Sequence, residues 1–369
     1  MRYIDEFRNP ELIRKTLDEI ERIVDANDHF RIIEACGGHT YSIFHFGLQK
    51  LLPKNIEFIH GPGCPVCVLP PGRVDEVLTI AAKNSDVVFT AFGDVMRVPG
   101  KFGSPLNYKA TGTDVRMIYS PLDALNIAIK NPDKKVILFA IGFETTAPST
   151  AITVLNAKEL NIDNFFVYSN HVKIVPVLQS ILDQPNMKID GFIGPGHASV
   201  IIGAKPYEII AKKYKKPIVI SGFEPLDILQ SILMLIKQLK RGEAKVENQY
   251  KRVVLEKGNV SALEIMNQVF EDRPAFEWRG LGAIQNSGLK LRPEFEKWDA
   301  EVYFNVEKII VEENKDAQCG EVLKGIIKPN QCKLFGKVCT PDNPIGALMV
   351  SSEGACATYY NHMFSSVAF

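Results

Sequence analysis

The chain has 369 residues, more than the roughly 250–300 at which a single hydrophobic core stops growing, so more than one structural unit is expected. Lys plus Arg and Asp plus Glu number 43 each, and this balance argues against nucleic acid or a membrane surface as a partner. The chain has no apolar run of the ~18 residues that span a bilayer, and its first ten residues carry charges where a signal peptide is apolar. We therefore expect a cytoplasmic protein, in which cysteine patterns indicate metal binding or catalysis rather than structural disulfides.

Short β-rich runs alternate with helical stretches through most of the chain. An amphipathic helix begins at Asn9-Pro10, because Asn is a favoured cap and Pro a favoured first helical residue. The predicted strands lie at 31–35, 56–60, 86–91, 115–119, 135–141, 164–168, 190–193 and 217–220. The predicted helices between them lie at 74–84, 121–131, 148–159, 173–183 and 225–240. This alternation predicts parallel sheets covered by helices on both faces.

The predicted fold is α/β, with two open, mainly parallel sheet domains and a loop-rich C-terminal domain. One closed barrel is the alternative, but the sulfur-bearing loops fall in the first half of the alternating region and the histidine loops in the second. The predicted sheet domains are 30–132 and 133–240, and residues 1–29 and 241–369 form the third, helical and irregular domain. From about residue 275 Pro, Gly and Cys are frequent, so we expect this domain to need a cross-link or a metal.

Six unusual motifs follow predicted strands directly. Open α/β sheets gather their ligand sites beyond the carboxyl ends of the strands, so we expect these motifs to form one functional region. The motifs are Cys36-Gly-Gly-His39, Gly-Pro-Gly-Cys64-Pro-Val-Cys67, Phe-Gly-Asp94-Val-Met-Arg97, Gly-Phe-Glu144-Thr-Thr, Asn170-His171 and Gly-Pro-Gly-His197.

The seven cysteines fall into an N-terminal and a C-terminal group, and the first group holds three. Cys64 and Cys67 have the Cys-x-x-Cys spacing of a redox pair or of half a zinc site, and the redox interpretation is favoured because a second half-site is far away. Cys36 and His39 offer a soft sulfur and an imidazole that suit iron, zinc or copper. A buried Cys beside a histidine bonded to the backbone is the structural alternative.

The second group comprises Cys319, Cys332, Cys339 and Cys356. Its spacing matches neither a zinc ribbon nor the bacterial ferredoxin run. Four thiols predict an all-sulfur site, which an iron–sulfur cube or a zinc ion would satisfy equally, with two disulfides a distant third.

Charged groups at other strand ends allow both functional and structural interpretations. Asp94, Arg97 and Glu144 could act as acid–base groups or orient a metal ligand, or could form ion pairs and helix caps. His171 and His197 are by default histidines with satisfied hydrogen bonds. Neither a Gly-x-Gly-x-x-Gly nor a Walker loop is present, which disfavours NAD and ATP.

These motifs, in order along nearly the whole chain, resemble those of the HypD family of hydrogenase maturation factors. The matching strings include Glu-Ala-Cys-Gly-Gly-His-Thr at 34–40, His-Gly-Pro-Gly-Cys-Pro-Val-Cys-Val at 60–68, Phe-Gly-Asp-Val-Met-Arg-Val-Pro-Gly at 92–100, Gly-Phe-Glu-Thr-Thr-Ala-Pro at 142–148, Gly-Pro-Gly-His at 194–197 and Val-Ser-Ser-Glu-Gly-Ala-Cys at 350–356. The chain departs from the family at Tyr41, where a second histidine is common, so the role of an imidazole at that position is in doubt.

The resemblance implies a scaffold on which the Fe(CN)2CO group of [NiFe] hydrogenase is assembled with the small chaperone HypC. In this scheme HypE, working with HypF, donates cyanide from a thiocyanate. Cys36 would bind the transient iron together with a cysteine of the chaperone. Cys64 and Cys67 would cycle between dithiol and disulfide.

The same resemblance implies that the four C-terminal cysteines hold a [4Fe-4S] cluster, which would make the C-terminal domain an iron–sulfur domain. His39, Asp94 and Glu144 lie in matching motifs, with individual roles that remain hypotheses. Two alternatives remain: an iron–sulfur disulfide reductase acting on another protein, and a zinc-stabilised binding protein. Whether the assembly factor is an enzyme in the turnover sense stays open.

Overall fold

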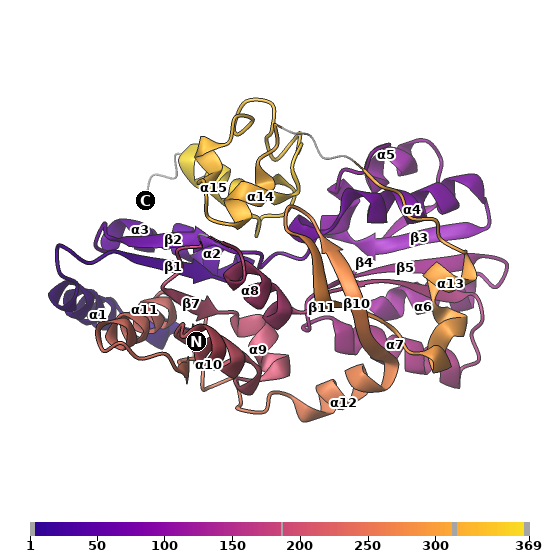
Figure 1. Ribbon diagram of the computed structural model, residues 1–369. Helices are drawn as coiled ribbons and strands as arrows, with labels where there is room; N and C mark the ends of the chain where they lie inside the picture. The colour runs from indigo at the N-terminus through magenta and orange to yellow at the C-terminus, as the bar shows by residue number, and fades with distance from the viewer. Residues whose placement is uncertain (1–3, 186, 312–315, 365–369) are drawn as a thin grey trace.

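The computed structural model describes residues 4–185, 187–311 and 316–364, and Figure 1 shows their arrangement. Two separate parallel sheets form its framework. Sheet A has the strand order β2 (Ile56–His60), β1 (Phe30–Glu34), β7 (Gly191–Gly194), β8 (Ile218–Ile220) and β9 (Val246–Asn248). Sheet B has the order β4 (Val115–Ile118), β3 (Val87–Phe92), β5 (Lys135–Gly142) and β6 (Phe165–His171). All eight predicted strands and the predicted pair of sheets are confirmed.

The sheets do not follow the predicted contiguous ranges 30–132 and 133–240. In sheet A, β1 pairs with β7 as well as β2, and in sheet B, β3 pairs with β5. The chain therefore leaves sheet A after β2, builds all of sheet B and then returns to sheet A. Hydrophobic periodicity identifies a strand but carries no information about its neighbour, so it could not reveal this return.

Helices cover both sheets as the alternation predicted. They include α1 (Pro10–Ile23), α4 (Pro71–Lys83), α6 (Pro121–Lys130), α7 (Ala147–Glu159), α8 (Ile174–Leu182), α10 (Glu208–Tyr214) and α11 (Pro225–Lys240). The side chain of Asn9 accepts hydrogen bonds from the N–H groups of Glu11 and Leu12, at 2.9 and 3.2 Å, which confirms the predicted start of α1. Within the described part of the chain, no helix is long and apolar enough to cross a membrane.

An antiparallel hairpin and a loop-rich unit complete the fold. The helix α12 (Val260–Val269) leads into β10 (Phe270–Trp278) and β11 (Gly282–Leu291), which lie between the two sheets (Figure 1). The C-terminal unit contains α14 (Cys319–Leu323) and α15 (Ala355–Phe364) and lies against sheet A on the side toward sheet B (Figure 1).

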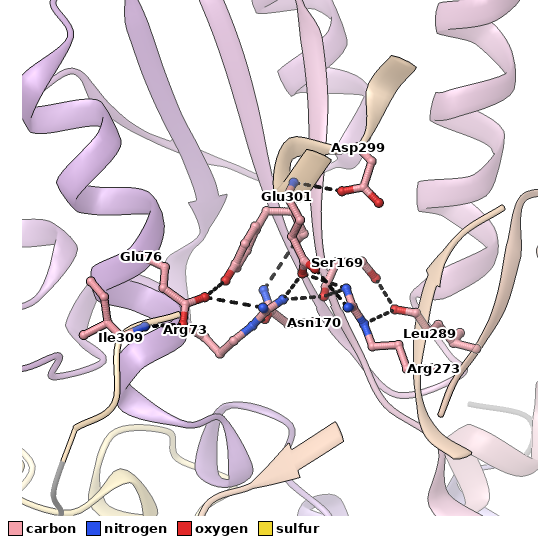
Figure 2. A network of polar contacts seen from close by, with 10 residues as sticks. Arg73, Glu76, Ser169, Asn170, Arg273, Leu289, Asp299, Glu301 and Ile309 are labelled. Carbon is pink, nitrogen blue, oxygen red and sulfur yellow. Dashed lines mark hydrogen bonds and ion pairs between the residues drawn. The ribbon is translucent and has the colours of Figure 1, made fainter. Parts of the chain in front are cut away.

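A partly buried polar network fastens the hairpin and the chain leading to the C-terminal unit onto sheet B (Figure 2). The guanidinium of Arg73 on α4 donates to Asn170 Oδ1 at 2.7 Å and to Glu301 Oε1 at 2.5 Å. Arg273 on β10 also donates to both carboxylate oxygens of Glu301, at 2.7 and 2.9 Å. Glu76 accepts from the backbone N–H of Ile309 at 3.1 Å. Arg73 and its partners therefore connect four segments that are distant in sequence: α4, β6, β10 and residues 301–309.

Candidate functional site

The motifs predicted to form one region do meet, around a cavity of about 700 Å³ between the carboxyl ends of sheets A and B. Loops that follow β1, β2, β3, β5 and β7 all line it, together with one segment of the C-terminal unit. The lining includes Cys36, Gly63, Asp94, Thr145, His197 and Glu353. Five of the six strand-end motifs therefore contribute residues to one cavity.

Cys36 is the N-cap residue of α2 (Gly37–His45), and its side chain makes no capping hydrogen bond. Burial and, to a smaller extent, the nearby Glu353 carboxylate together raise the pKa of the Cys36 thiol to about 12. The backbone N–H groups of Gly38 and His39 at the helix start act in the opposite direction, because they stabilise a thiolate. Sγ lies 3.7 Å from Nδ1 of His197.

His39 is hydrogen-bonded to the backbone that follows β8 and does not line the cavity. Its Nε2 lies 3.2 and 3.1 Å from the carbonyl oxygens of Ser221 and Gly222, so that nitrogen carries the hydrogen and donates. Its Nδ1 is buried without a partner, and burial lowers the pKa of His39 to about 4. The structure thus places His197 in the cavity beside the Cys36 sulfur, and it binds His39 to the backbone that follows β8, as in the structural alternative.

Phe223 fixes both imidazole rings, and the glycines of two motifs make room for it. Its ring stacks on His39 at 4.6 Å and on His197 at 4.0 Å between centroids. A Cβ at Gly38 would lie 2.9 Å from Phe223 Cε1, and a Cβ at Gly196 would lie 2.9 Å from Phe223 Cε2. These glycines are therefore required by close packing rather than by chain flexibility.

Cys64 and Cys67 are joined by a disulfide, which is the oxidised state of the predicted redox pair. They flank the start of a 3-10 turn, η2 (Val66–Val68), just before α4. The N–H of Cys67 donates to Cys64 Sγ at 3.3 Å, and both sulfur-bearing residues are buried. Their neighbours Pro65 and Val66 line the cavity, so the disulfide lies directly behind its wall.

The four C-terminal cysteines surround one small space of about 10 Å³. The rest of its lining includes Val322, Leu334, Phe335, Leu348 and Met349. Burial raises the pKa of Cys356 well above its ordinary value, and the charges of the other three thiols raise it further. Among the described residues, no group of three or more His, Cys, Asp or Glu side chains is arranged to hold a metal ion. Four thiols with an apolar lining are nonetheless the donor set that iron–sulfur clusters take.

One segment, residues 351–356, connects the sulfur groups. Glu353 lines the cavity that contains Cys36. A Cβ at Gly354 would lie 3.1 Å from Cys67 Sγ, so the segment passes close to the disulfide there. Cys356 belongs to the four-thiol group. Six consecutive residues, 351–356, therefore lie next to the cavity of Cys36, next to the Cys64–Cys67 disulfide and in the four-thiol group.

The strand-end loop of β3 holds this segment in place. Ser351 donates from its hydroxyl to Asp94 Oδ2 at 3.2 Å, and Arg97 donates to the carbonyl oxygen of Val350 at 3.2 Å. Burial raises the pKa of Glu353, and the charge of Asp94 adds to the effect. Asp94 and Arg97 thus dock the C-terminal unit. Glu353 was not among the predicted site residues, although it lies in the motif Val-Ser-Ser-Glu-Gly-Ala-Cys at 350–356.

Glu34 is a second residue that the sequence argument missed. Its buried carboxyl accepts hydrogen bonds from the hydroxyl of Thr40, from His60 Nδ1 at 2.7 Å and from the N–H of Cys36 at 3.4 Å. Burial raises the pKa of Glu34. His60 Nε2 lies 3.3 Å from the hydroxyl of Tyr359 on α15. The sequence did offer one signal for Glu34, since a carboxyl group at the end of an apolar strand needs a polar partner.

Glu144 and His171 occupy structural positions behind the cavity. Glu144 Oε1 accepts from the N–H of Ile174 at the start of α8, at 3.0 Å, whereas Oε2 is buried without a partner. Burial raises the pKa of Glu144 to about 7. His171 Nε2 lies 3.0 Å from the hydroxyl of Thr150, and burial lowers its pKa to about 4. Glu144 is a helix cap, and His171 is a satisfied core histidine.

Comparison with known proteins identifies the family. A family model described as "HypD: Hydrogenase formation hypA family" matches residues 11–363. The chain belongs to the HypD family.

Similar family members cover almost the whole chain. The chain is 51% identical over 371 residues to hydrogenase maturation factor HypD of Rhodobacter capsulatus, with 98% of each chain covered. It is 49% identical over 367 residues to the HypD of Escherichia coli K12, again with 98% of each covered. The HypD of Cupriavidus necator is 47% identical over 369 residues, which are 98% of this chain and 97% of that one.

Proposed function

We propose that this protein acts in hydrogenase maturation, as the scaffold and redox component for assembly of the Fe(CN)2CO group of [NiFe] hydrogenase. Its family and its relatives support the general role. The observation that carries the specific role is the segment 351–356, which lies beside the cavity thiol, the disulfide and the four-thiol group. A scaffold that both holds iron and reduces a ligand donor needs these groups close together.

The iron is the cargo, and Cys36 is its proposed ligand on this chain. Its thiol lies in the cavity at the N-terminus of α2, where burial raises the pKa and the backbone N–H groups of Gly38 and His39 act in the opposite direction, so the charge of an arriving metal ion would supply the rest of the stabilisation of the thiolate. The second thiolate would come from a HypC-like chaperone that covers the cavity. A cavity of about 700 Å³ has room for an iron with diatomic ligands.

Cys64 and Cys67 are the proposed two-electron donor to a thiocyanate carried by a HypE-like protein. In this step the bond between the donor sulfur and the cyano carbon breaks, and an S–S bond forms between Cys64 and Cys67. One thiol proton protonates the donor sulfur and the other is released to solvent, while cyanide leaves as CN⁻ and binds the iron. The disulfide of the structure is the product state of this reaction.

Cys319, Cys332, Cys339 and Cys356 are the proposed ligands of a [4Fe-4S] cluster. Such a cluster, when bound, supplies electrons one at a time. The chain encloses these thiols in apolar side chains that limit the access of water. Gly354 and the docking contacts of Asp94 and Arg97 keep Cys356 close to the disulfide.

A disulfide reductase that acts on another protein is less well supported. Cys64 is 5% exposed and Cys67 is 1% exposed, so an external protein disulfide cannot reach either sulfur in this conformation. A thiocyanate that enters the adjoining cavity has a shorter path, since Gly63, Pro65 and Val66 form part of its wall.

The experiment that tests the proposal compares three variants, each purified anaerobically with a HypC-like partner. Cys36→Ala should lose the bound iron and the infrared bands of CN and CO while keeping the brown colour of the cluster. Cys64→Ser should keep the iron but lose the cyanide bands. Cys339→Ala should lose the colour. Iron loading in Cys36→Ala, or cyanide bands in Cys64→Ser, would contradict the corresponding role.

A further inference from the structure

The four C-terminal thiols differ in how far solvent reaches them. Cys332 is partly exposed, whereas the other three thiols of the group are buried. Cys356 lies on the segment 351–356, which passes close to the disulfide. Cys332 lies instead at the start of the loop 332–339. The thiol on the disulfide side is therefore buried, and the thiol that a molecule in solution can approach comes from a different segment.

The inner face of the loop 332–339 is apolar. The N–H of Phe335 donates to the carbonyl oxygen of Cys332 at 3.1 Å, and the N–H of Cys339 donates to the carbonyl oxygen of Leu334 at 3.1 Å. These hydrogen bonds make the loop a compact turn that begins and ends at a thiol of the group. The side chains of Leu334 and Phe335 line the four-thiol space. The loop therefore forms a thin cover between the thiols and the surface.

The outer face of the same loop carries positive charge. The side chains of Lys333 and Lys337 are exposed, and that of Val338 beside them is 53% exposed. Among the described residues, neither of these two ammonium groups forms an ion pair. By contrast, Nζ of Lys328 lies 3.8 Å from a carboxylate oxygen of Glu57. Two uncompensated cations and one apolar side chain therefore lie next to the partly exposed thiol.

The sequence around the loop concentrates this charge. Residues 324–341 include four lysines and neither Asp nor Glu, although basic and acidic residues are balanced over the whole chain. Asp316, Glu321 and Asp342 lie outside this run. A surface of one charge attracts partners of the opposite charge and increases the rate at which they associate. The partner that this surface fits is therefore acidic.

The proposed function requires electrons to enter the chain. Each cyanide transfer leaves the Cys64–Cys67 disulfide, and its return to two thiols takes two electrons and two protons. Electron transfer slows steeply with distance, so a protein that delivers the electrons must come close to the four-thiol group. Electron-carrying proteins bind transiently through small surfaces, and the loop 332–339 offers such a surface at Cys332.

We propose that the loop 332–339 is the docking surface of an acidic protein that carries one electron at a time. Lys333 and Lys337 bind its carboxylates, and Cys332 is the point at which each electron enters. Two carrier molecules are each oxidised by one electron, solvent supplies two protons, and the S–S bond between Cys64 and Cys67 breaks to give two thiols. The inference rests on the proposed function in taking the four thiols as cluster ligands, and it names the class of partner that supplies the electrons.

Cross-linking to an acidic carrier tests where docking occurs. The probe is a plant-type [2Fe–2S] ferredoxin, mixed with the full-length protein at low ionic strength. A water-soluble carbodiimide joins ammonium groups to carboxylates in contact with them, and mass spectrometry of the peptides identifies the lysines. We expect cross-links at Lys333 and Lys337 that disappear at high ionic strength. Cross-links confined to other lysines would overturn the inference.

Charge reversal tests whether docking controls the rate of reduction. Lys333→Glu/Lys337→Glu should be bleached by reduced ferredoxin at least tenfold more slowly at low ionic strength, and salt should remove the difference because it screens exposed charges. The control Lys15→Glu/Lys257→Glu changes the net charge equally, at exposed positions on α1 and before α12, and its rate should change by less than about twofold. Equal rates in the two double variants would overturn the inference.

A neutral reductant separates this inference from the proposed function. Photoreduced deazaflavin should bleach the visible absorbance of the unmodified chain and of both double variants at the same rate, which shows that each is folded and loaded. Failure to bleach the unmodified chain would contradict the four-thiol cluster itself, and the docking surface with it. Bleaching by deazaflavin, together with a ferredoxin rate that is independent of Lys333 and Lys337, would contradict the docking surface alone.

Discussion

Gly354 lies close to the Cys64–Cys67 disulfide. A Cβ there would lie 3.1 Å from Cys67 Sγ and would overlap the carbonyl oxygen of Leu348. Overpacking a buried position costs about 1–3 kcal/mol. We therefore predict that Gly354→Ala lowers the free energy of unfolding by about that amount and speeds reduction of the disulfide by a small thiol.

Urea unfolding and the rate of thiol release measure the two effects. Gly93→Ala is the matched control, because a Cβ at Gly93 would meet its nearest neighbour at an ordinary distance of 3.4 Å. The control should change the free energy of unfolding by less than about 0.5 kcal/mol. Equal stability and equal reduction rates in the two variants would show that the backbone at Gly354 does not press on Cys67.

Glu144 gives the protein a pH dependence that can be isolated by substitution. Burial raises the pKa of its carboxyl to about 7 in the folded chain, from an ordinary value of 4.5. As the pH rises from 4.5 to 7, the unfolded chain loses this proton and the folded chain keeps it, so folding becomes less favourable and then levels off above 7. The full difference corresponds to about 3 kcal/mol.

The permanently neutral variant Glu144→Gln should lack this loss. The difference in free energy of unfolding between the unmodified chain and the variant should therefore shift by up to about 3 kcal/mol, in favour of the variant, between pH 4 and pH 8. Denaturant titrations at several pH values measure it, and the contributions of the buried histidines cancel in the comparison. A difference independent of pH would contradict the raised pKa.

At the scale of elements, the strand-end loop of β3 holds the C-terminal unit. The guanidinium of Arg97 donates to the carbonyl oxygen of Val350, and a hydrogen bond from a charged donor contributes about 1.5–3 kcal/mol, which is tenfold or more in an opening equilibrium. We predict that Arg97→Ala raises amide hydrogen exchange in residues 345–356 by about tenfold. Arg8→Ala, which removes a distant surface pair with Glu224, should leave it unchanged. Equal exchange in both variants would show that this docking contact is unimportant.

The elements that the sequence revealed are those with a strong local signal. Apolar runs between turn residues identified eight of the nine strands of the two parallel sheets, all except the short edge strand β9, and Asn9-Pro10 identified the start of α1. Strand β10 was missed because Pro274 argues against a strand, yet the pairing shifts between Arg273 and Ala275 and this bulge accommodates the proline. Proline is disfavoured inside a strand, and only the pairing of β10 with β11 explains why Pro274 is tolerated here.

The sequence predicted which loops form the candidate site, but it did not predict which residues of those loops lie in contact, because tertiary contacts determine that. Strand-end position correctly selected the loops of Cys36, Cys64 and Asp94 for one cavity. It paired Cys36 with His39 and did not predict that the His197 ring lies beside the Cys36 sulfur, because this placement depends on how β1 pairs with β7 and on the stacking of Phe223. Nor could it select Glu353, whose position depends on the docking of a unit almost 260 residues away from Asp94.

For the whole molecule, the network around Arg73 is the main polar link between sheet B, the hairpin and the chain that leads to the C-terminal unit (Figure 2). Arg73 and Glu301 are 15% and 24% exposed, and Glu301 would keep its partner Arg273, so the expected loss is that of hydrogen bonds from a charged donor, about 1.5–3 kcal/mol. We predict that Arg73→Met lowers the free energy of unfolding by about that amount, as measured by urea titration.

The control for this prediction is a pair near the surface. Arg116 and Asp114 are 35% and 31% exposed, and such pairs contribute about 0–1 kcal/mol. Arg116→Met should therefore have little effect. A loss in Arg73→Met no larger than in Arg116→Met would mean that apolar packing alone holds the hairpin on sheet B.

The most direct test of the central claim compares the number of Cys64–Cys67 disulfides formed with the number of cyanide ligands transferred to iron. The protein, with Cys64 and Cys67 reduced and with iron and the chaperone bound, is mixed with a thiocyanate-charged donor in the absence of any other reductant. Mass spectrometry then counts disulfides, and infrared spectroscopy counts cyanide bound to iron. The account predicts one Cys64–Cys67 disulfide for each cyanide transferred, and no transfer beyond the first. Cyanide transfer that leaves both thiols free would contradict it.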